Sequence, residues 1–242
     1  MEKASINLIK EVKKQSRENR YLLFLDNVKI VKDGIKSKYF KPIIAFTSDE
    51  NLHLDLDCKI YHTSYKTIES LVDTKTPQNV CVMLEYIPHI VEKPKTNFLV
   101  LDKIQDPGNA GTLIRTAKAT GFDYVFMLDS VKLTNSKLIR SSVGGIFGLE
   151  VFEMTKEEFI SYQKEWNFPL IMADMDGENV FEAEIKQQVG VVVGNEGKGV
   201  SDEIASLCTK TLSIPMKEGI ESLNAGVSGS IIMYQINKDS LK

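Results

Sequence analysis

The chain has 242 residues, of which 43% are hydrophobic, and it carries a formal net charge of −3. This length allows one large domain or two small ones with a real hydrophobic core, and the small negative charge gives no overall indication of nucleic-acid binding. The charge is uneven, because residues 1–96 carry 16 Lys and Arg against 13 Asp and Glu, whereas residues 97–242 carry 14 against 20. The window from Lys3 to Lys41 holds 11 basic and 4 acidic residues. It fits a surface for phosphates and fits equally a solvated, lysine-rich helical face.

Little in the sequence supports a metal site. Its candidate ligands are scattered and show no paired spacing: Cys58, Cys81, Cys208, His53, His62 and His89. Unpaired thiols are typical of a reducing compartment. Residues 1–20 are charged throughout and no apolar run has membrane length, so we expect a protein without signal peptide or membrane span, located in the cytoplasm.

The first ninety residues alternate short helical and extended patterns. The predicted helices are residues 6–14, 28–37 and 67–73, and the predicted strands are residues 21–25, 42–46, 59–62 and 79–86. This pattern predicts a small α/β domain over residues 1–90. A segment rich in proline and charge, residues 88–95, follows as the linker.

Residues 97–242 predict a second, larger α/β domain. Its predicted strands are residues 98–102, 124–128, 169–172, 189–193 and 211–214, with one more near Val151. Its predicted helices are residues 110–120, 136–143, 156–166 and 223–235, with one more near Asp202. Alternating strands and helices imply a largely parallel sheet covered on both faces.

The first candidate site lies in the segment LDKIQDPGNAGTLIRTAKATG, residues 101–121. Asp106-Pro107-Gly108 is a turn signal after a strand, and Asn109 is expected to cap the following helix. Arg115 lies about two turns into that helix and is one of only four arginines in a chain with 26 lysines. A guanidinium offers a forked contact to phosphate or carboxylate. A surface ion pair is the equally simple alternative for Arg115.

The second candidate is the glycine-rich segment VVVGNEGKGVSDEI, residues 191–204. Its glycines, Gly194, Gly197 and Gly199, run G-x-x-G-x-G and do not have the dinucleotide spacing G-x-G-x-x-G. Glu196 within the loop would repel a pyrophosphate, which argues against NAD. The loop suits a neutral or cationic ligand, or else it is a tight turn with a solvated glutamate.

The third candidate is LSIPMKEGIESLNAGVSGSIIMYQ, residues 212–235. Ser222 is expected to cap the last helix, and Asn224 is expected to lie in its first turn. The helix is rich in Gly, Ser and Ala, which indicates close approach of another backbone. Its apolar stripe fits core packing, with a subunit interface as an additional role.

In this order, the three segments resemble the SpoU/TrmH family of RNA ribose 2′-O-methyltransferases, within the SPOUT superfamily. The similarity covers about residues 97–237 and is carried by DPGN-x-G-T-x-x-R-T-A, V-x-G-N-E-G-x-G and I-P-M…E-S-L-N, with LIRSSVGGIFGLEV between the first two. Residues 1–90 resemble, more weakly, the ribosomal-protein-like RNA-binding domain that often precedes this catalytic domain. Leu25-Asp26-Asn27 stands where many relatives carry Glu-Gly, a departure that bears on the substrate and not on the chemistry.

The resemblance implies a fold and a cofactor. It implies a trefoil-knotted, largely parallel α/β methyltransferase domain that works as a homodimer, with its active site near the subunit interface. It implies S-adenosylmethionine as the cofactor, held mainly by backbone groups in the knot. The matching cofactor-binding positions are Val193, Gly194, Ile214, Met216 and Leu223.

The resemblance also implies the reactive residues. Arg115 matches the arginine to which the family assigns activation of the ribose hydroxyl, and its supporting residues match Asn109, Glu196, Ser222 and Asn224. A guanidinium has a pKa above about 12, so Arg115 as base needs desolvation or a nearby phosphate to take the proton. A cationic Arg115 that orients phosphate and stabilises the alkoxide is the alternative.

The leading hypothesis is therefore S-adenosylmethionine-dependent 2′-O-methylation of RNA, with ribosomal RNA favoured over transfer RNA because of the N-terminal domain. The motifs fit a housekeeping and an antibiotic-resistance enzyme alike. A noncatalytic RNA-binding or ribosome-assembly factor that retains the fold is the alternative from another class, and the intact set of reactive residues counts against it. A nucleotide-dependent oxidoreductase fails on the glycine spacing and on Glu196.

Overall fold

The computed structural model describes residues 1–185 and 188–241, and these residues form two compact units. The first comprises Met1–His89 with Thr134–Ser136, and the second comprises the other described residues. No helix of the described residues is both long enough and apolar enough to cross a membrane. Each unit is considered by itself below.

The first unit is a five-stranded sheet with three helices. Its helices are α1 (Ile6–Glu18), α2 (Val28–Gly34) and α3 (Tyr65–Leu71). Its strands are β1 (Glu2–Lys3), β2 (Leu22–Leu25), β3 (Phe40–Thr47), β4 (Lys59–His62) and β5 (Val80–Tyr86). They are ordered β1-β4-β3-β5-β2, with β4 parallel to both neighbours and β5 antiparallel to both.

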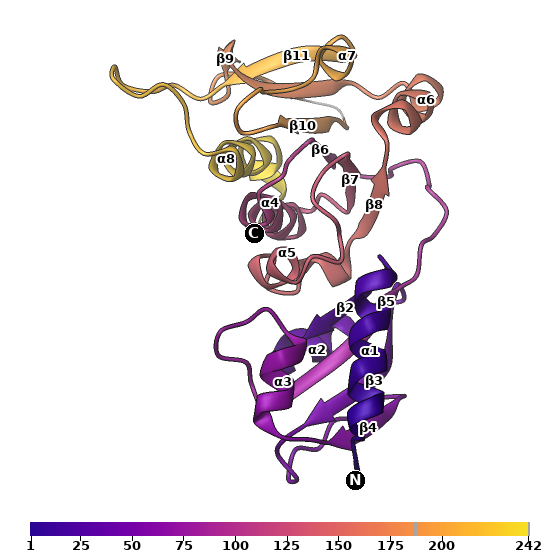
Figure 1. Ribbon diagram of the computed structural model, residues 1–242. Coiled ribbons are helices and arrows are strands. Elements are labelled where there is room, and N and C mark those ends of the chain that lie inside the picture. The colour runs from indigo at the N-terminus through magenta and orange to yellow at the C-terminus, as the bar shows by residue number, and fades with distance from the viewer. Residues whose placement is uncertain (186–187, 242) are drawn as a thin grey trace. The chain divides into compact units, whose positions relative to one another are not determined.

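Side-chain caps fix where these helices start, because Ser5, Asn27 and Ser64 each accept a hydrogen bond from the backbone N–H three residues on. Within this unit α1 and α3 lie in front of the sheet in Figure 1, and α2 lies behind it. Val12 of α1 and Ile68 of α3 pack on Phe46 in one buried cluster. The basic window of the sequence is therefore divided between two faces, since α1 and α2 cover opposite sides of the sheet.

The second unit is a six-stranded sheet in which every pairing is parallel, ordered β11-β9-β10-β6-β7-β8. Its strands are β6 (Phe98–Asp102), β7 (Tyr124–Leu128), β8 (Glu150–Met154), β9 (Leu170–Asn179), β10 (Gly190–Gly194) and β11 (Cys208–Ser213). Its helices are α4 (Pro107–Thr120), α5 (Ser136–Ser141), α6 (Lys156–Trp166), α7 (Asp202–Ala205) and α8 (Ala225–Asn237), with the 3₁₀ turns η1 (Gly145–Gly148) and η2 (Lys238–Ser240). The predicted α/β class with a mostly parallel sheet is confirmed.

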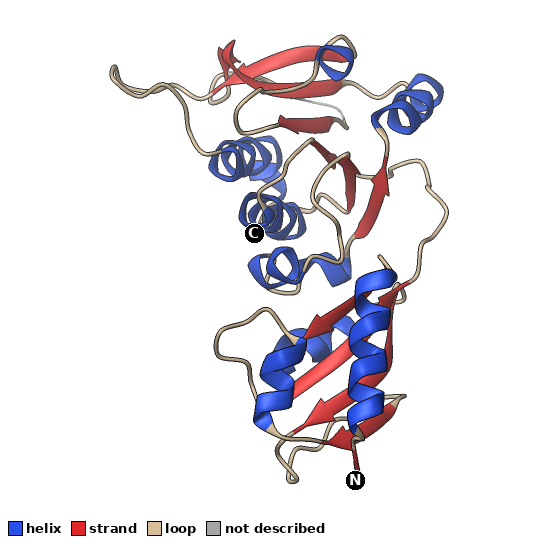
Figure 2. Cartoon of the chain, in the orientation of Figure 1, coloured by secondary structure: helices blue, strands red, loops and turns tan. Residues whose placement is uncertain are grey.

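Helices cover both faces of this sheet, with α4 and α8 on one side and α6 on the other in Figure 2. The central strands are buried on both faces and so read as continuous apolar runs. On one face Phe126 packs among Phe159 and Trp166 of α6, and Ile204 of α7 joins the same cluster. Because successive side chains of a strand alternate between faces, Leu99 and Leu101 point to the α4 and α8 side while Asp102 points to the α6 and α7 side.

In the second unit, two helix starts differ from the sequence prediction. Helix α4 begins at Pro107, and its cap is Asp106, whose carboxylate accepts from Asn109 N at 2.8 Å. Proline at the first helical position loses no hydrogen bond, so the helix begins three residues earlier than expected. Helix α8 is capped by Asn224 and not by Ser222, because the Asn224 side chain accepts from Val227 N at 3.3 Å. The predicted end of α4 at residue 120 is confirmed, and Gly121 follows it in the left-handed conformation, with φ of 77°.

Candidate functional site

A cavity of about 310 Å³ opens beside the carboxyl ends of β9, β10 and β11, the edge where open α/β sheets bind ligands. All five predicted cofactor-binding residues line it: Val193, Gly194, Ile214, Met216 and Leu223. Glu196 and Ser222, from the predicted reactive set, also line it. Side chains of α8 and of the end of β9 complete the wall.

The glycine-rich loop after β10 is a closed turn. Asn195 and Gly199 exchange two backbone hydrogen bonds of 2.9 Å each. Gly194 can only be glycine here, because a Cβ atom would lie 2.2 Å from Gly199 C and from Val200 N. Gly199 closes the turn with φ of 71°. The loop therefore presents backbone to the cavity.

A chain of side-chain hydrogen bonds joins all three candidate segments. Asn224 Nδ2 donates to Asn109 Oδ1 at 2.8 Å, and Asn109 Nδ2 donates to Glu196 Oε1 at 3.0 Å. The backbone N–H of Asp106 also donates to Glu196 Oε1, at 3.3 Å. Three predicted residues, 87 and 115 positions apart along the chain, thus meet in one network.

This network changes the acidity of Glu196. Partial burial by itself raises the pKa of Glu196, but hydrogen bonds from the Asn109 side chain and from backbone N–H groups outweigh it and leave that pKa below its ordinary value. The carboxylate is thus ionised at neutral pH. It acts here as a hydrogen-bond acceptor and as a negative charge on the cavity wall.

Arg115 and Ser222 do not belong to the hydrogen-bonded chain. Arg115 lies exposed on α4, two turns past Asn109, and has no ion-pair or hydrogen-bond partner through its side chain among the described residues. The surface ion pair considered for it is therefore not formed within the described chain. Ser222 is exposed on the cavity wall, two residues before the cap of α8.

Small residues let α8 pack directly on α4. A Cβ atom on Gly229 would lie 2.4 Å from Leu113 Cδ2 and 2.8 Å from Val193 Cγ2. Thr116 and Ser230 share a hydrogen bond of 2.9 Å between the same two helices. The close approach that the glycine and serine content predicted is confirmed, and it places Asn224 against Asn109.

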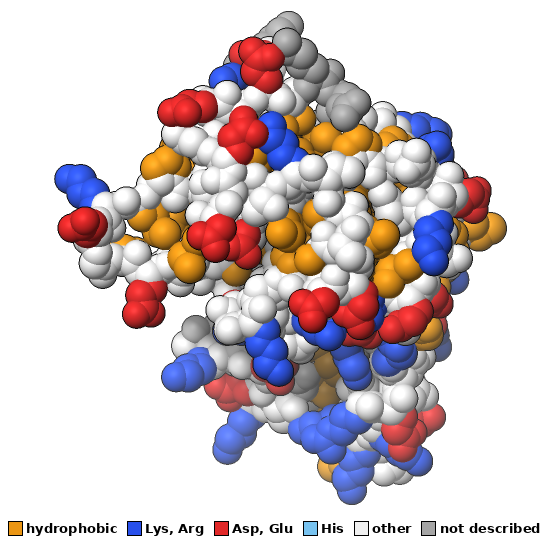
Figure 3. Space-filling model, turned by 90° about the horizontal axis from the view of Figure 1, so that it is seen from above, with side chains coloured by type: hydrophobic (Ala, Val, Ile, Leu, Met, Phe, Trp, Pro, Cys, Tyr) orange, Lys and Arg blue, Asp and Glu red, His pale blue; other side chains and the backbone are white. Residues whose placement is uncertain are grey.

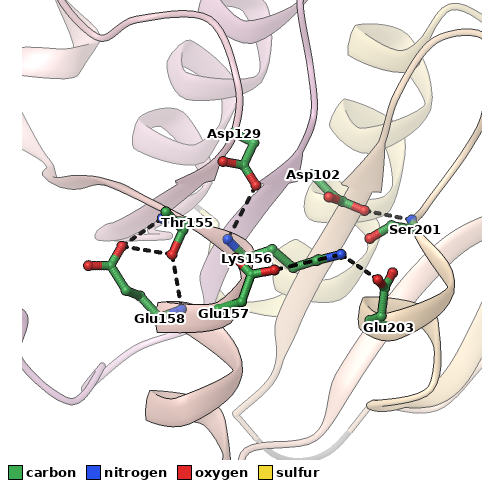
Figure 4. A network of polar contacts seen from close by, with 8 residues as sticks. All are labelled: Asp102, Asp129, Thr155, Lys156, Glu157, Glu158, Ser201 and Glu203. Atoms are coloured by element: carbon green, nitrogen blue, oxygen red, sulfur yellow. Dashed lines mark hydrogen bonds and ion pairs between the residues drawn. The ribbon is translucent and has the colours of Figure 1, made fainter.

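A second polar network holds the far end of the glycine-rich segment. Asp102, fully buried at the end of β6, accepts from Ser201 N at 2.6 Å, and Lys156 pairs with Glu203 of α7 nearby (Figure 4). On the cavity side, Asn195 Nδ2 donates at 2.9 Å to the carbonyl of Lys103, a residue with φ of 57°. The segment 194–201 is therefore tied at both ends to the end of β6.

The sequence analysis missed one wall of the cavity. The strand predicted at residues 169–172 continues to Asn179, and Ala173, Asp174 and Met175 line the cavity. The rule that strand ends carry ligand-binding side chains, applied to that predicted strand, would have pointed to Asp174. No local pattern in the sequence indicates that the strand extends beyond residue 172 to residue 179.

The arrangement can bind a compact organic ligand between backbone and apolar walls, with carboxylate and amide groups at one side. Among the described residues there is no group of three or more metal-ligating side chains. A parallel α/β domain with such a cavity at the carboxyl ends of its strands has the usual form of a small-ligand site.

The sequence model of the SpoU rRNA Methylase family matches residues 96–234, so the chain belongs to this family. The protein of Bacillus subtilis named 23S rRNA (guanosine(2553)-2′-O)-methyltransferase RlmP is 27% identical over 228 residues, which cover 93% of this chain and 91% of that one. The 23S rRNA (adenosine(1067)-2′-O)-methyltransferase of Streptomyces laurentii is 30% identical over 149 residues, which cover 60% of this chain and 55% of that one.

Solved structures share the fold. The AdoMet-bound rRNA methyltransferase of Sinorhizobium meliloti has a TM-score of 0.87 at 20% identity, covering 100% of this chain and 99% of that one. The SpoU methyltransferase AviRb of Streptomyces viridochromogenes, in complex with AdoMet, has a TM-score of 0.83 at 20% identity, covering 99% and 95%. Their likeness extends over both units of the chain.

Proposed function

We propose that this protein is an S-adenosylmethionine-dependent methyltransferase that modifies a ribose 2′-hydroxyl in RNA, and that ribosomal RNA is its substrate. Membership of the SpoU family and the names of its relatives support the reaction class. The observation that carries the proposal for this chain is the cavity, whose wall brings together every residue expected to hold the cofactor.

The residues present fit S-adenosylmethionine. The cavity volume of about 310 Å³ lies within the range of small-ligand pockets, about 300–1,000 Å³. Val193, Leu212 and Leu223 offer apolar wall, and the backbone of the glycine-rich loop offers hydrogen-bonding groups. When bound, the cofactor supplies a methyl group on a sulfonium centre that a hydroxyl oxygen can attack in line.

The protein's part is to place and activate the hydroxyl. We assign Asn109 and Asn224 to orientation, because Asn224 donates to Asn109 and Asn109 in turn donates to Glu196. Because an ionised carboxylate accepts hydrogen bonds and never donates them, Glu196 fixes the direction of the hydrogen bonds among these three side chains. Ser222, on the cavity wall and outside the chain, is assigned to a contact with the ribose or the cofactor.

Arg115 is assigned to the RNA. Its exposure and its lack of an internal partner leave the guanidinium available for a phosphate, and a phosphate beside it can take the hydroxyl proton. In this assignment Arg115 stays cationic and stabilises the developing alkoxide, since solvent around it keeps it far from the desolvation that a guanidine base requires.

RNA selection is assigned to the first unit. Exposed cations occur on both of its faces, with Lys10 and Arg17 on α1 and Lys29 and Lys32 on α2. Reversing the charge of one pair of these cations at a time identifies the face that binds RNA. We expect Lys29→Glu with Lys32→Glu, or Lys10→Glu with Arg17→Glu, to weaken RNA binding and to flatten its dependence on salt, with cofactor affinity unchanged.

We further propose the trefoil knot and the homodimer that the family resemblance implies, and a cytoplasmic place of action. Support for the knot is the path of the chain, since β11 lies at the edge of the sheet beyond β9 while the next helix, α8, packs back on α4. Support for a dimer is the exposure of Val227 (45%) and Tyr234 (50%) on α8. Sedimentation equilibrium measures the dimer.

The reaction is tested by transfer of tritium from labelled S-adenosylmethionine to ribosomal RNA from a strain that lacks this gene, followed by digestion and mapping. One 2′-O-methylated nucleotide is the expected product. Cofactor binding without incorporation into any RNA, with ribosome-assembly intermediates included, would contradict the proposal. Loss of both binding and incorporation would favour the noncatalytic RNA-binding factor.

A further inference from the structure

Strand β9 has a five-residue bulge beside the cavity. Met172 pairs with Thr211 of β11 and the next pair is Glu178 with Leu212, so residues 173–177 have no partner on β11. Gly177 closes this bulge, because a Cβ there would lie 2.6 Å from Leu212 C and 2.7 Å from Thr211 C and O. A bulge closed so tightly against backbone re-aims the side chains before it.

The bulge adds a negative charge to the cavity wall. Asp174 lines the cavity, and so does Glu196 from the opposite loop. The described residues that line the cavity include these two carboxylates and no lysine or arginine. Figure 3, which views the second unit from above, shows acidic, basic and hydrophobic side chains mixed over that face. The surroundings of the ligand are therefore apolar and negative.

The two carboxylates differ in the hydrogen bonds that they accept from the protein. Glu196 accepts from the Asn109 side chain and from the backbone of Asp106, so its oxygens are engaged with the protein. Asp174, in the described chain, accepts a single long contact of 3.4 Å from Asp176 N and pairs with no cation. Its charge is available to a ligand.

We propose that Asp174 is a specificity-determining residue that makes the cavity select a ligand with a net positive charge. This rests on the proposed function. S-Adenosylmethionine carries a sulfonium, an ammonium and a carboxylate and is a net cation, whereas S-adenosylhomocysteine, left after methyl transfer, has lost the sulfonium charge and is neutral. Asp174 thus favours the methyl donor over the spent product when the two compete for the cavity.

The expected change in affinity follows from the solvent exposure of Asp174. Asp174 is solvent-exposed, so its attraction for one charge about 4 Å away is on the order of that in water. This corresponds to an affinity difference of about fivefold. Because the charges are exposed to solvent, added salt reduces the difference.

The test is calorimetric titration of the full-length protein with S-adenosylmethionine and, separately, with S-adenosylhomocysteine. Asp174→Asn keeps the shape of the side chain and removes its charge. We expect it to weaken the methyl donor about fivefold and to leave S-adenosylhomocysteine within about twofold. Asp176→Asn is the matched control, because Asp176 lies on the same bulge, is exposed and does not line the cavity; it should change neither affinity.

The outcomes separate this inference from the function on which it rests. Wild-type protein that binds neither compound would overturn the proposed function itself. Wild-type binding together with equal losses for both compounds in Asp174→Asn would overturn the inference, since the contact would then be to a group that both share. No change in either affinity, or an equal effect of Asp176→Asn, would overturn it as well.

Discussion

Gly194→Ala is the substitution whose effect can be worked out most directly from the geometry. The added methyl group would lie 2.2 Å from Gly199 C, 2.2 Å from Val200 N and 2.4 Å from Gly199 O. All three are backbone atoms of the opposite arm of the same loop, so no side chain can swing aside. The loop must open, and the wall of the cavity moves with it.

The cost of such overpacking is about 1–3 kcal/mol. Cofactor affinity falls by about 5- to 150-fold if all of that strain is relieved by a shift that spoils the binding wall. The sheet below keeps its pairing, because Gly194 is the last residue of β10. We therefore expect a large loss of affinity with a much smaller change in melting temperature.

Gly197→Ala is the matched control in the same loop. Its new Cβ would meet only Asn195 Oδ1, at 3.8 Å, which is ordinary contact. Titration calorimetry with S-adenosylmethionine measures both variants, and circular dichroism measures their melting. Wild-type affinity in Gly194→Ala would refute the reasoning. A loss in Gly197→Ala as large as in Gly194→Ala would show that the clash is not the cause.

Three further predictions use the polar residues around the cavity. Arg115→Ala should lower single-turnover methyl transfer by at least about 100-fold with melting unchanged, since the side chain has no internal partner among the described residues; near-normal turnover would remove Arg115 from the reactive centre. Asp102→Ala should lower the free energy of unfolding in urea by about 1–3 kcal/mol, because Ser201 N–H loses its buried acceptor; Ser201→Ala keeps that N–H and should cost less. Asn109→Ala should raise the pKa of Glu196, because a hydrogen bond to its carboxylate is lost. The lowered pKa of Glu196 in the folded protein stabilises the fold at pH values above the ordinary carboxyl pKa of about 4.3. This stabilisation is lost as the pH falls through the pKa of Glu196 in the folded protein. The stability gap between wild type and Asn109→Ala should therefore narrow below about pH 4, and a gap that does not change with pH would contradict the role given to this hydrogen bond.

Local patterns in the sequence determined most of the secondary structure. The runs at 98–102 and 124–128 are continuous apolar stretches because central parallel strands are buried on both faces, and the structure has strands with those bounds. Helix α6 likewise has the predicted bounds, since a capping box of Thr155 and Glu158 fixes its start. The predicted starts of α4 and α8 were wrong by three and two residues, because several adjacent Asp, Ser and Asn residues were equally plausible caps.

What the sequence by itself determined was the set of candidate site residues, because their types and spacing are local and form recognisable motifs. Which of them touch was decided by the tertiary structure. The Asn109 contact with Glu196 depends on β10 lying beside β6, and the contact with Asn224 depends on glycines that let α8 pack against α4. Asp174 enters the wall because β9 leaves the register of β11 for five residues. Such placements depend on strand order and on backbone contacts between distant segments. The periodicity of a single segment does not indicate which other segment it packs against.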